Sequence, residues 1–197
     1  MNFDKLIDDG YQICEVTLQG DVKYIIENIE DAFSAKLTRT TLLSSNDISG
    51  CLAIQHDDFW FHTDGCFLDI PPRWVALQIL DSGEGGDIEI LDVFEKIERV
   101  RKRCFIYGAK GFGVRRQVVD QVRGMSCLRY RSDYMQEIVP GSLEELDRCI
   151  ANASGGASRL VGMTANAIVV IDNWRVMHRR TAFTGDRLVK RFWFDAI

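Results

Sequence analysis

Two histidines and one aspartate are the residues whose types and spacing could carry out chemistry. His62 and Asp64 form an H-x-D pair in an extended segment, where alternate residues point to the same side and can bind one ion. His178 would complete a set of two histidines and one carboxylate, which holds Fe(II) on one face and leaves three coordination positions open. A structural zinc site would instead be closed. The open positions suit O₂ and a keto acid such as 2-oxoglutarate.

An H-x-D pair alone is more often an ordinary hydrogen-bonded pair at a strand end, so this interpretation depends on the C-terminal segment. Arg187 and Arg191 follow His178 on the next predicted strand and share one face of it because they are four residues apart. A guanidinium gives the far carboxylate of 2-oxoglutarate a planar partner with two donors. Taken singly, each arginine is as well explained by a surface ion pair.

The elements that must position these residues are predicted to be mostly strands. Helical spacing of apolar residues predicts a helix over 22–36, and capping patterns predict one after Asp92 and one from Ser142. A short loop is expected over 153–158. Strand patterns occupy 50–54, 58–62, 74–80, 87–91, 103–107, 126–131, 166–171, 175–178 and 187–194. Many short strands without βαβ alternation favour a mainly β fold with peripheral helices, a double-stranded β-helix or jelly roll.

The composition predicts one domain over 1–197. The chain has 197 residues, 46% of them hydrophobic, and a net charge of −5 with scattered Lys and Arg, which argues against nucleic-acid binding. It contains no apolar run long enough for a membrane span and no apolar leader after Met1, so the cytoplasm is the expected location. Six cysteines without a C-x-x-C pair indicate reduced thiols. A homo-oligomer is compatible with the sequence, which does not define the oligomeric state.

Three blocks of the sequence resemble the Fe(II)/2-oxoglutarate dioxygenases of the taurine dioxygenase and clavaminate synthase-like group. They are Phe61-His62-Thr63-Asp64-Gly65-Cys66-Phe67 with Pro71-Pro72, Gly85-Gly86-Asp87 leading to Asp92, and Asp172-Asn173-x-Arg175 through His178, Arg180, Phe183, Arg187 and Arg191. The resemblance implies that His62, Asp64 and His178 bind iron and that Arg187 holds the distal carboxylate of 2-oxoglutarate. It implies that Arg191 assists Arg187 or meets an anionic group of the substrate, and that Arg180 joins a strand pair.

Three departures from the family pattern bear on the site. Ile88 stands where the family commonly has a threonine whose hydroxyl helps to hold 2-oxoglutarate, and Arg179 replaces the usual glycine after the distal histidine. The chain is also short for the family. One cosubstrate hydrogen bond is therefore missing or comes from another residue, and any substrate lid is abbreviated or supplied by a partner chain.

The reaction implied by the resemblance is hydroxylation or desaturation of a small amino-acid-like or otherwise anionic metabolite, with succinate and CO₂ as co-products. The candidate substrate contacts are Gln55, His56, Trp60, Arg129, Tyr130 and Arg131. Two other functions stay open: a cupin-like metalloenzyme that does not use 2-oxoglutarate, and an inactive binding module that has kept the fold. The substrate and the position oxidised cannot be named from the sequence.

Overall fold

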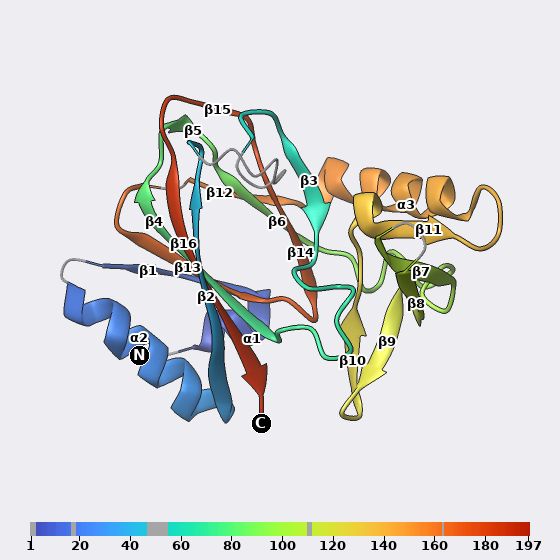
Figure 1. The fold of residues 1–197 in the computed structure, drawn as a ribbon, viewed down its shortest axis with the longest axis horizontal. Helices are drawn as coiled ribbons and strands as arrows, with labels where there is room; N and C mark the ends of the chain where they lie inside the picture. The colour runs from blue at the N-terminus through green and yellow to red at the C-terminus, as the bar shows by residue number, and fades with distance from the viewer. Residues whose placement is uncertain (1–2, 17–18, 47–54, 110–111, 163) are drawn as a thin grey trace.

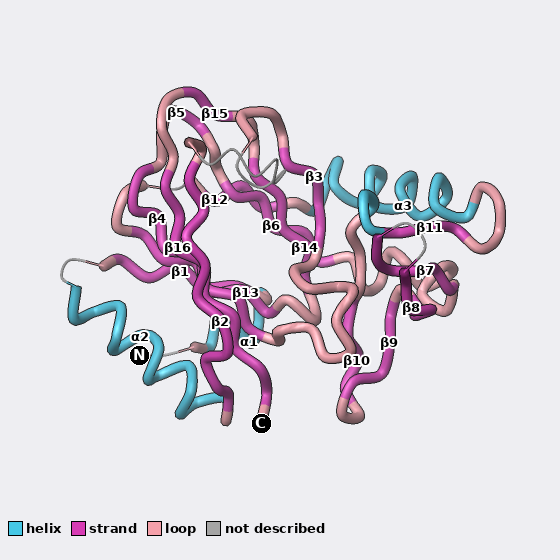
Figure 2. Tube along the Cα trace, viewed as in Figure 1, coloured by secondary structure: helices cyan, strands magenta, loops and turns pink. Residues whose placement is uncertain are grey.

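The computed structural model describes residues 3–16, 19–46, 55–109, 112–162 and 164–197. Strands dominate it, and the helices lie at the periphery (Figure 2). The mainly β fold class is confirmed. The predicted strand over 50–54 lies outside the described residues.

Two antiparallel sheets form the centre of the molecule (Figure 1). The larger sheet has the order β1-β13-β4-β16-β2, with bounds Tyr11–Glu15, Ala167–Asp172, Trp74–Asp81, Leu188–Ala196 and Ala35–Ser44. The smaller sheet has the order β12-β6-β14-β3, with bounds Arg159–Val161, Ile88–Asp92, Val176–Arg180 and Phe59–His62. A short ladder of β15 (Phe183–Thr184) and β5 (Glu84–Gly85) lies beyond them. Six predicted strands recur here within one or two residues at each end.

Strand β4 shows why the sequence produces two packed layers. Its side chains alternate between two apolar clusters, because successive residues of a strand point to opposite faces. Trp74 and Ala76 pack toward the N-terminal helices, whereas Val75, Leu77 and Ile79 pack toward the smaller sheet. A strand buried on both faces needs a mostly apolar run. The segment Trp74 to Leu80 supplies one, with Gln78 as its one polar residue.

Helix α2 (Gln19–Phe33) covers the outer face of the larger sheet (Figure 1). Ile25 and Ile29 are buried against that sheet, which is the face that their spacing predicts. The expected end at residue 36 is wrong. Ser34 has a left-handed φ of 45°, which ends the helix, and the next residue begins β2. Helix α1 (Asp4–Asp9), which the sequence patterns did not predict, packs beside it.

A second lobe stands beside the sheets. It contains helix α3 (Ser142–Ala157), the short 3₁₀ helix η2 (Ser132–Tyr134), a sheet of β11-β7-β8 and a ladder of β10-β9. The bounds of these strands are Met135–Glu137, Cys104–Ala109, Phe112–Gln117, Met125–Leu128 and Val119–Val122. The strand predicted over 126–131 therefore ends early. Helix α3 is confirmed, but it runs to Ala157, so the loop expected over 153–158 is wrong.

The helix predicted after Asp92 is wrong as well. The segment forms separate turns, with isolated bonds such as Ile97 N–H to Val93 O (3.1 Å) and Val100 N–H to Ile97 O (2.9 Å). Val93, Ile97 and Val100 are nevertheless buried in the core of the second lobe. A series of turns thus satisfies the same apolar spacing that favours a helix.

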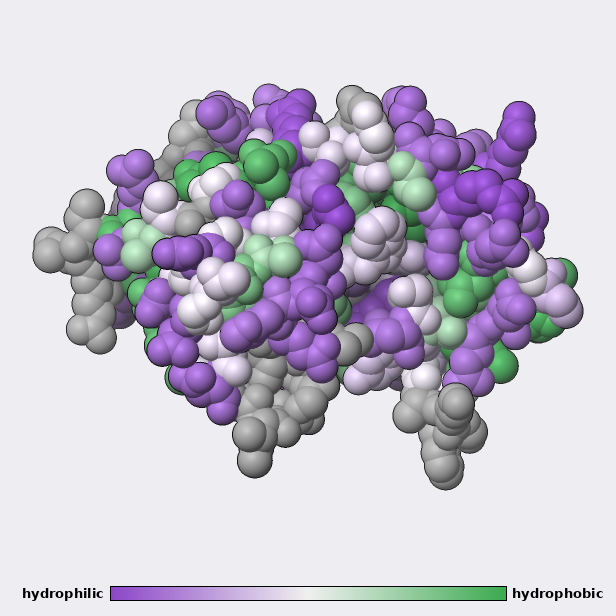
Figure 3. Space-filling model, turned by 90° about the horizontal axis from the view of Figure 1, so that it is seen from above, coloured by the Kyte–Doolittle hydropathy of each residue, from purple (hydrophilic) through white to green (hydrophobic). Residues whose placement is uncertain are grey.

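Polar residues cover much of the face seen in Figure 3, and its apolar residues occur in small groups. None of the helices in the described residues has the length and apolar content to cross a membrane. The five described cysteines are free thiols, and Cys14, Cys66 and Cys127 are buried. Cys51 lies outside the described residues.

Candidate active site

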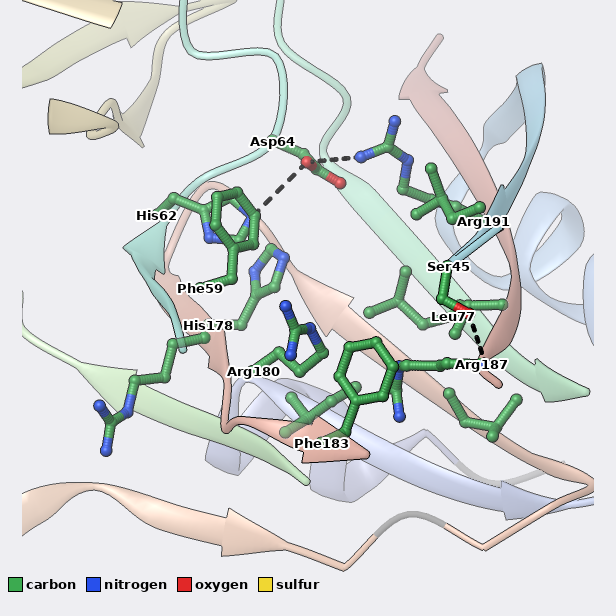
Figure 4. A pocket seen from close by; sticks show the side chains of 15 residues that line it. Ser45, Phe59, His62, Asp64, Leu77, His178, Arg180, Phe183, Arg187 and Arg191 are labelled. Carbon is green, nitrogen blue, oxygen red and sulfur yellow. Dashed lines mark hydrogen bonds and ion pairs between the residues drawn. The ribbon is translucent and has the colours of Figure 1, made fainter. Parts of the chain in front are cut away.

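The three predicted metal ligands meet between the two sheets (Figure 4). His62, the last residue of β3, is paired directly with His178 of β14, and their ring centroids are 4.3 Å apart. Asp64 follows two residues after His62. One candidate ligand atom from each of the three lies within 4.8 Å of the others. Atoms bonded at about 2 Å to one ion lie at most about 4 Å apart, so small side-chain shifts would let all three bind it.

Burial keeps both imidazoles neutral. It is the main cause that lowers the pKa of His62 and of His178, and for His62 the neighbouring His178 lowers it further. His62 Nδ1 lies 3.0 Å from Trp60 O, which leaves Nε2 turned toward Asp64. His178 Nδ1 is buried without a hydrogen-bond partner. Neutral imidazoles with free nitrogens are the form that binds metal, so these residues fit a divalent metal ion.

Asp64 is held as a carboxylate by two donors. Arg191 Nη1 donates to its Oδ1 over 3.0 Å, and Trp193 Nε1 donates to its Oδ2 over 3.1 Å. Burial alone would raise the pKa of Asp64, but Arg191 and the two histidines lower it to about 2. Arg191 therefore contributes to the site by its ion pair with Asp64, the predicted acidic ligand. The sequence patterns did not point to Trp193.

Asn173 holds the backbone of the Asp64 loop. Its Oδ1 accepts a hydrogen bond from Asp64 N–H (2.7 Å), and its Nδ2 donates to Asp64 O (3.0 Å) and Pro72 O (2.8 Å). Asn173 is fully buried, so these bonds satisfy its amide. The family resemblance includes Asn173 in one of its blocks without assigning it a role, and a buried amide bonded to a distant loop leaves no local pattern.

A pocket extends from the metal-ligand cluster to Arg187 (Figure 4). Arg187 is 6% exposed, and its Nη1 donates to Ser82 O (3.0 Å). No carboxylate of the described residues forms an ion pair with it. Burial and the charge of Arg180 lower the pKa of Arg187 to about 10, and the weaker influence of Asp87 does not offset them. A buried guanidinium in this state is favourable only with an anion beside it.

Gly86 makes room for that guanidinium. It has a φ of 72°, and a Cβ atom at this position would overlap Nη1 of Arg187. A glycine meets both requirements because it lacks the Cβ and adopts positive φ without strain.

The middle of the pocket is apolar. The side chains that line it there are Leu43, Leu77, Ile79, Ile88 and Val189. Ile88 is 3% exposed and offers no hydrogen bond at the position where the family commonly has threonine. The pocket thus has polar groups at its two ends and an apolar wall between them.

Arg180 joins β14 to the segment before β3, as the sequence predicted. Its Nη2 donates to Gln55 O (2.5 Å) and to Asp57 O (2.9 Å). The guanidinium also lies 4.6 Å from the ring centroid of Phe183, which separates it from Arg187 in the pocket wall.

A second hollow adjoins the metal-ligand cluster on the other side of Phe59 and His62. It is lined by Gln55, Asp57, Asp58, Phe59, Trp60, Phe61, His62, Arg131, Ser132 and Asp133. Three of the predicted substrate contacts, Gln55, Trp60 and Arg131, are among these residues. Arg131 pairs through Nε and Nη2 with the carboxylate of Asp133 and stands 5.3 Å from the ring centroid of Phe59.

The other predicted substrate contacts do not line either hollow. Arg129 is fully buried and donates to the backbone oxygens of Cys66, Leu68 and Asp69. Tyr130 donates its hydroxyl proton to Asp147 (2.6 Å). His56 stacks on Phe183. Arg129 and Tyr130 therefore stabilise the second lobe, and the alternating pattern around them reflects its core.

Comparison with known proteins gives one family. Residues 113–193 match the family described as taurine catabolism dioxygenase TauD, TfdA family. This stretch includes His178, Arg187 and Arg191. The predicted resemblance to the taurine dioxygenase family is confirmed. No curated protein matches this chain.

Solved structures share the fold of this chain. Asparagine oxygenase in complex with Fe(II), 2S,3S-3-hydroxyasparagine and succinate has a TM-score of 0.59 and 15% identity over 77% of this chain and 56% of its own. PvcB from Pseudomonas aeruginosa has a TM-score of 0.65 and 14% identity over 95% and 76%. The non-heme iron oxygenase OrfP in complex with Fe, succinate and (3S)-hydroxy-L-Arg has a TM-score of 0.69 and 12% identity over 99% and 79%. The chain spans about half the length of asparagine oxygenase.

Proposed function

We propose that this chain is an Fe(II)- and 2-oxoglutarate-dependent oxygenase that hydroxylates an unactivated C–H bond of a small amino-acid-like or otherwise anionic metabolite. The observation that carries the proposal is a single pocket with two ends. One end holds the buried cluster of His62, Asp64 and His178. The other end holds the buried guanidinium of Arg187, which lacks a carboxylate partner among the described residues.

The metal end suits Fe(II) because its donor set is two neutral imidazoles and one ionised carboxylate. When bound, iron and 2-oxoglutarate would supply the oxidising chemistry with O₂, giving succinate and CO₂ as co-products. The chain's own residues orient the ligands: Arg191 and Trp193 hold the carboxylate of Asp64. The ordering of ligands by such outer partners commonly decides metal affinity.

The arginine end suits the distal carboxylate of 2-oxoglutarate. Arg187 presents a planar fork of donors, and a carboxylate there would neutralise a buried positive charge. The apolar wall of Leu77, Ile79 and Ile88 would contact the two methylene groups between the carboxylates. This wall also keeps water away from the reacting atoms. Arg191 is assigned mainly to the metal end, because it forms an ion pair with Asp64.

The substrate is proposed to enter through the second hollow, because Phe59 and His62 line both this hollow and the 2-oxoglutarate pocket. Its lining includes Arg131 together with the carboxylates of Asp57, Asp58 and Asp133. Charges of both signs suit a zwitterionic metabolite. Asparagine oxygenase and OrfP, whose structures contain a hydroxylated asparagine and a hydroxylated arginine, support an amino-acid-like substrate.

We further propose that the two facing sheets form a double-stranded β-helix and that residues 1–197 make one domain. The apolar cluster between the sheets, with Val75, Ile90 and Val169 among its members, supports this arrangement. The cytoplasmic location and homo-oligomer formation stay predictions.

Anaerobic titration with Fe(II) and 2-oxoglutarate tests the function. Chelation of the keto acid by iron gives a weak visible charge-transfer band, which we expect in the native chain. His178→Ala and Arg187→Ala should each abolish or weaken the band. Arg148→Ala removes an exposed arginine that pairs only with Glu144 on α3, and this control should leave the band unchanged.

The titration also separates the alternatives. Iron binding without a band at any 2-oxoglutarate concentration would contradict the proposal and favour a cupin-like metalloenzyme. Absence of iron binding would favour an inactive binding module. An undiminished band in the Arg187→Ala variant would mean that another residue binds the distal carboxylate of 2-oxoglutarate.

A further inference from the structure

The pocket lacks a hydroxyl at the position where its family relatives commonly have one. Ile88 occupies that position at the start of β6, and its side chain is buried in the pocket wall. A carboxylate bound by one guanidinium retains acceptor sites that the arginine does not fill. A second donor near Arg187 would therefore strengthen the binding of a dicarboxylate.

Ser45 supplies a hydroxyl at the arginine end of the pocket, from the segment that follows β2. It follows directly after β2 and lines the pocket beside Arg187 (Figure 4). Two hydrogen bonds hold it to the backbone of Arg187: its N–H donates to Arg187 O (3.0 Å), and its Oγ accepts from Arg187 N–H (2.9 Å). The hydroxyl oxygen is thus held at a defined position against the strand that carries the arginine.

The geometry leaves the hydroxyl proton of Ser45 available. A serine hydroxyl is one donor and two acceptors, and here Arg187 N–H uses the oxygen as an acceptor. Among the described residues no acceptor for the proton is found. Rotation about the C–O bond can therefore direct the proton into the pocket, where the described side chains place a guanidinium and apolar groups.

We propose that Ser45 donates its hydroxyl proton to the distal carboxylate of 2-oxoglutarate that Arg187 binds, in place of the threonine that Ile88 replaces. This inference rests on the proposed function, because it needs 2-oxoglutarate in the pocket. It assigns the cosubstrate a binding residue directly after β2, the strand on the far side of β16 from β4.

The test measures binding by calorimetry, without turnover, in the full chain loaded with Mn(II). Two keto acids are compared: 2-oxoglutarate, and 2-oxopentanoate, which has the same chain length without the distal carboxylate. Ser45→Ala should weaken 2-oxoglutarate binding by about 10–100-fold, the effect of one hydrogen bond to a carboxylate. It should leave 2-oxopentanoate binding unchanged, because that ligand has no carboxylate to accept the proton.

Three further variants test the assignment. Ser45→Thr keeps the hydroxyl and should bind 2-oxoglutarate nearly as the native chain does. Ile88→Thr in the Ser45→Ala background should recover part of the lost affinity, because it returns a hydroxyl to the family position. Ser44→Ala is the matched control: Ser44 is the neighbouring serine, and its Oγ accepts only from Asn46 N–H (3.3 Å).

Two results would overturn the proposal. Equal binding of 2-oxoglutarate by Ser45→Ala and the native chain would mean that the hydroxyl does not reach the carboxylate. An equal loss for both keto acids would mean that Ser45 maintains the shape of the whole pocket and does not act at the distal carboxylate. A native chain that binds neither keto acid would instead refute the proposed function itself, and Ser45 with it.

Discussion

Arg191 Nη1 lies 3.0 Å from Oδ1 of Asp64 and forms a partly buried ion pair with it. The same guanidinium stands 4.8 Å from the ring centroid of Trp193, whose indole N–H binds the other oxygen of Asp64. Two residues of β16 thus hold both oxygens of one carboxylate. Arg191 follows His178 in the sequence, but in the folded chain it binds the carboxylate of Asp64, which follows His62.

Replacement of Arg191 by methionine should weaken metal binding by about 10–100-fold, the usual effect of losing an outer partner of a metal ligand. The physical reason is that the carboxylate of Asp64 loses the charge that keeps it ionised and oriented. Isothermal titration with Mn(II) measures the effect. Trp193→Phe, which removes one neutral donor, should weaken binding less.

The role of Arg191 toward 2-oxoglutarate is separated by measuring keto-acid affinity at saturating Mn(II). If Arg191 acts through Asp64, keto-acid affinity should change little once the metal is bound. Unaltered metal affinity in Arg191→Met, with a large loss of 2-oxoglutarate affinity, would instead assign Arg191 to the cosubstrate.

Gly86→Ala should weaken 2-oxoglutarate binding because the added Cβ would overlap the guanidinium of Arg187. Gly124→Ala is a matched control. Gly124 has a similar φ, 79° against 72°, but nothing lies within 4 Å of the added Cβ. Both variants should lose about 1 kcal/mol of stability from strained backbone. Only Gly86→Ala should lose affinity in a keto-acid titration, and equal affinities of the two variants would contradict the packing argument.

Metal addition should raise the thermal unfolding temperature, because the ion binds the folded chain at a site that the unfolded chain lacks. At a metal concentration about 100 times the dissociation constant the gain is about 2.7 kcal/mol. Removal of the ion with a chelator should reverse it. Asp64→Ala and His178→Ala should show no metal-dependent shift, whereas His56→Ala should retain it, since His56 stacks on Phe183 outside the ligand cluster. A shift that persists in Asp64→Ala would place the ion elsewhere.

The sequence predicted that His62 and Asp64 lie close together because they are only two residues apart. The expected strand alternation is not what brings them together, since β3 ends at His62 and Asp64 lies in the turn that follows. The sequence did not predict Asn173 or Trp193, whose bonds to Asp64 cross 109 and 129 residues of chain. Such contacts depend on the order in which strands pair, and a local sequence pattern does not determine that order.

The fold was predicted best where apolar runs are long, as in β4, and worst where one pattern suits two structures. The spacing of Val93, Ile97 and Val100 fits a helix, but a series of turns buries the same side chains. Strand β2 was missed because most of its residues are only partly buried or exposed, so its composition lacks a clear apolar period.

Asp172→Asn should stabilise the protein, and more at neutral than at acid pH. Burial raises the pKa of Asp172 to about 6, despite the opposing charge of Arg73. A carboxyl whose pKa is higher in the folded state binds protons more readily there. Ionising it therefore costs stability as pH rises from about 4, its unfolded pKa, to about 6. Asparagine avoids that cost and keeps an oxygen to accept Trp174 N–H.

The expected gain is about 1–3 kcal/mol near pH 7.5, and about 1 kcal/mol less near pH 5. Urea unfolding at both pH values measures it. Asp81→Asn is the control, because Asp81 also accepts a backbone N–H, that of Gly83, but is exposed and bears no burial cost. A gain that is equal at both pH values would show that packing, and not the charge of Asp172, is responsible. A loss of stability at pH 7.5 would show that the attraction between Asp172 and Arg73 outweighs the cost of burying the carboxylate.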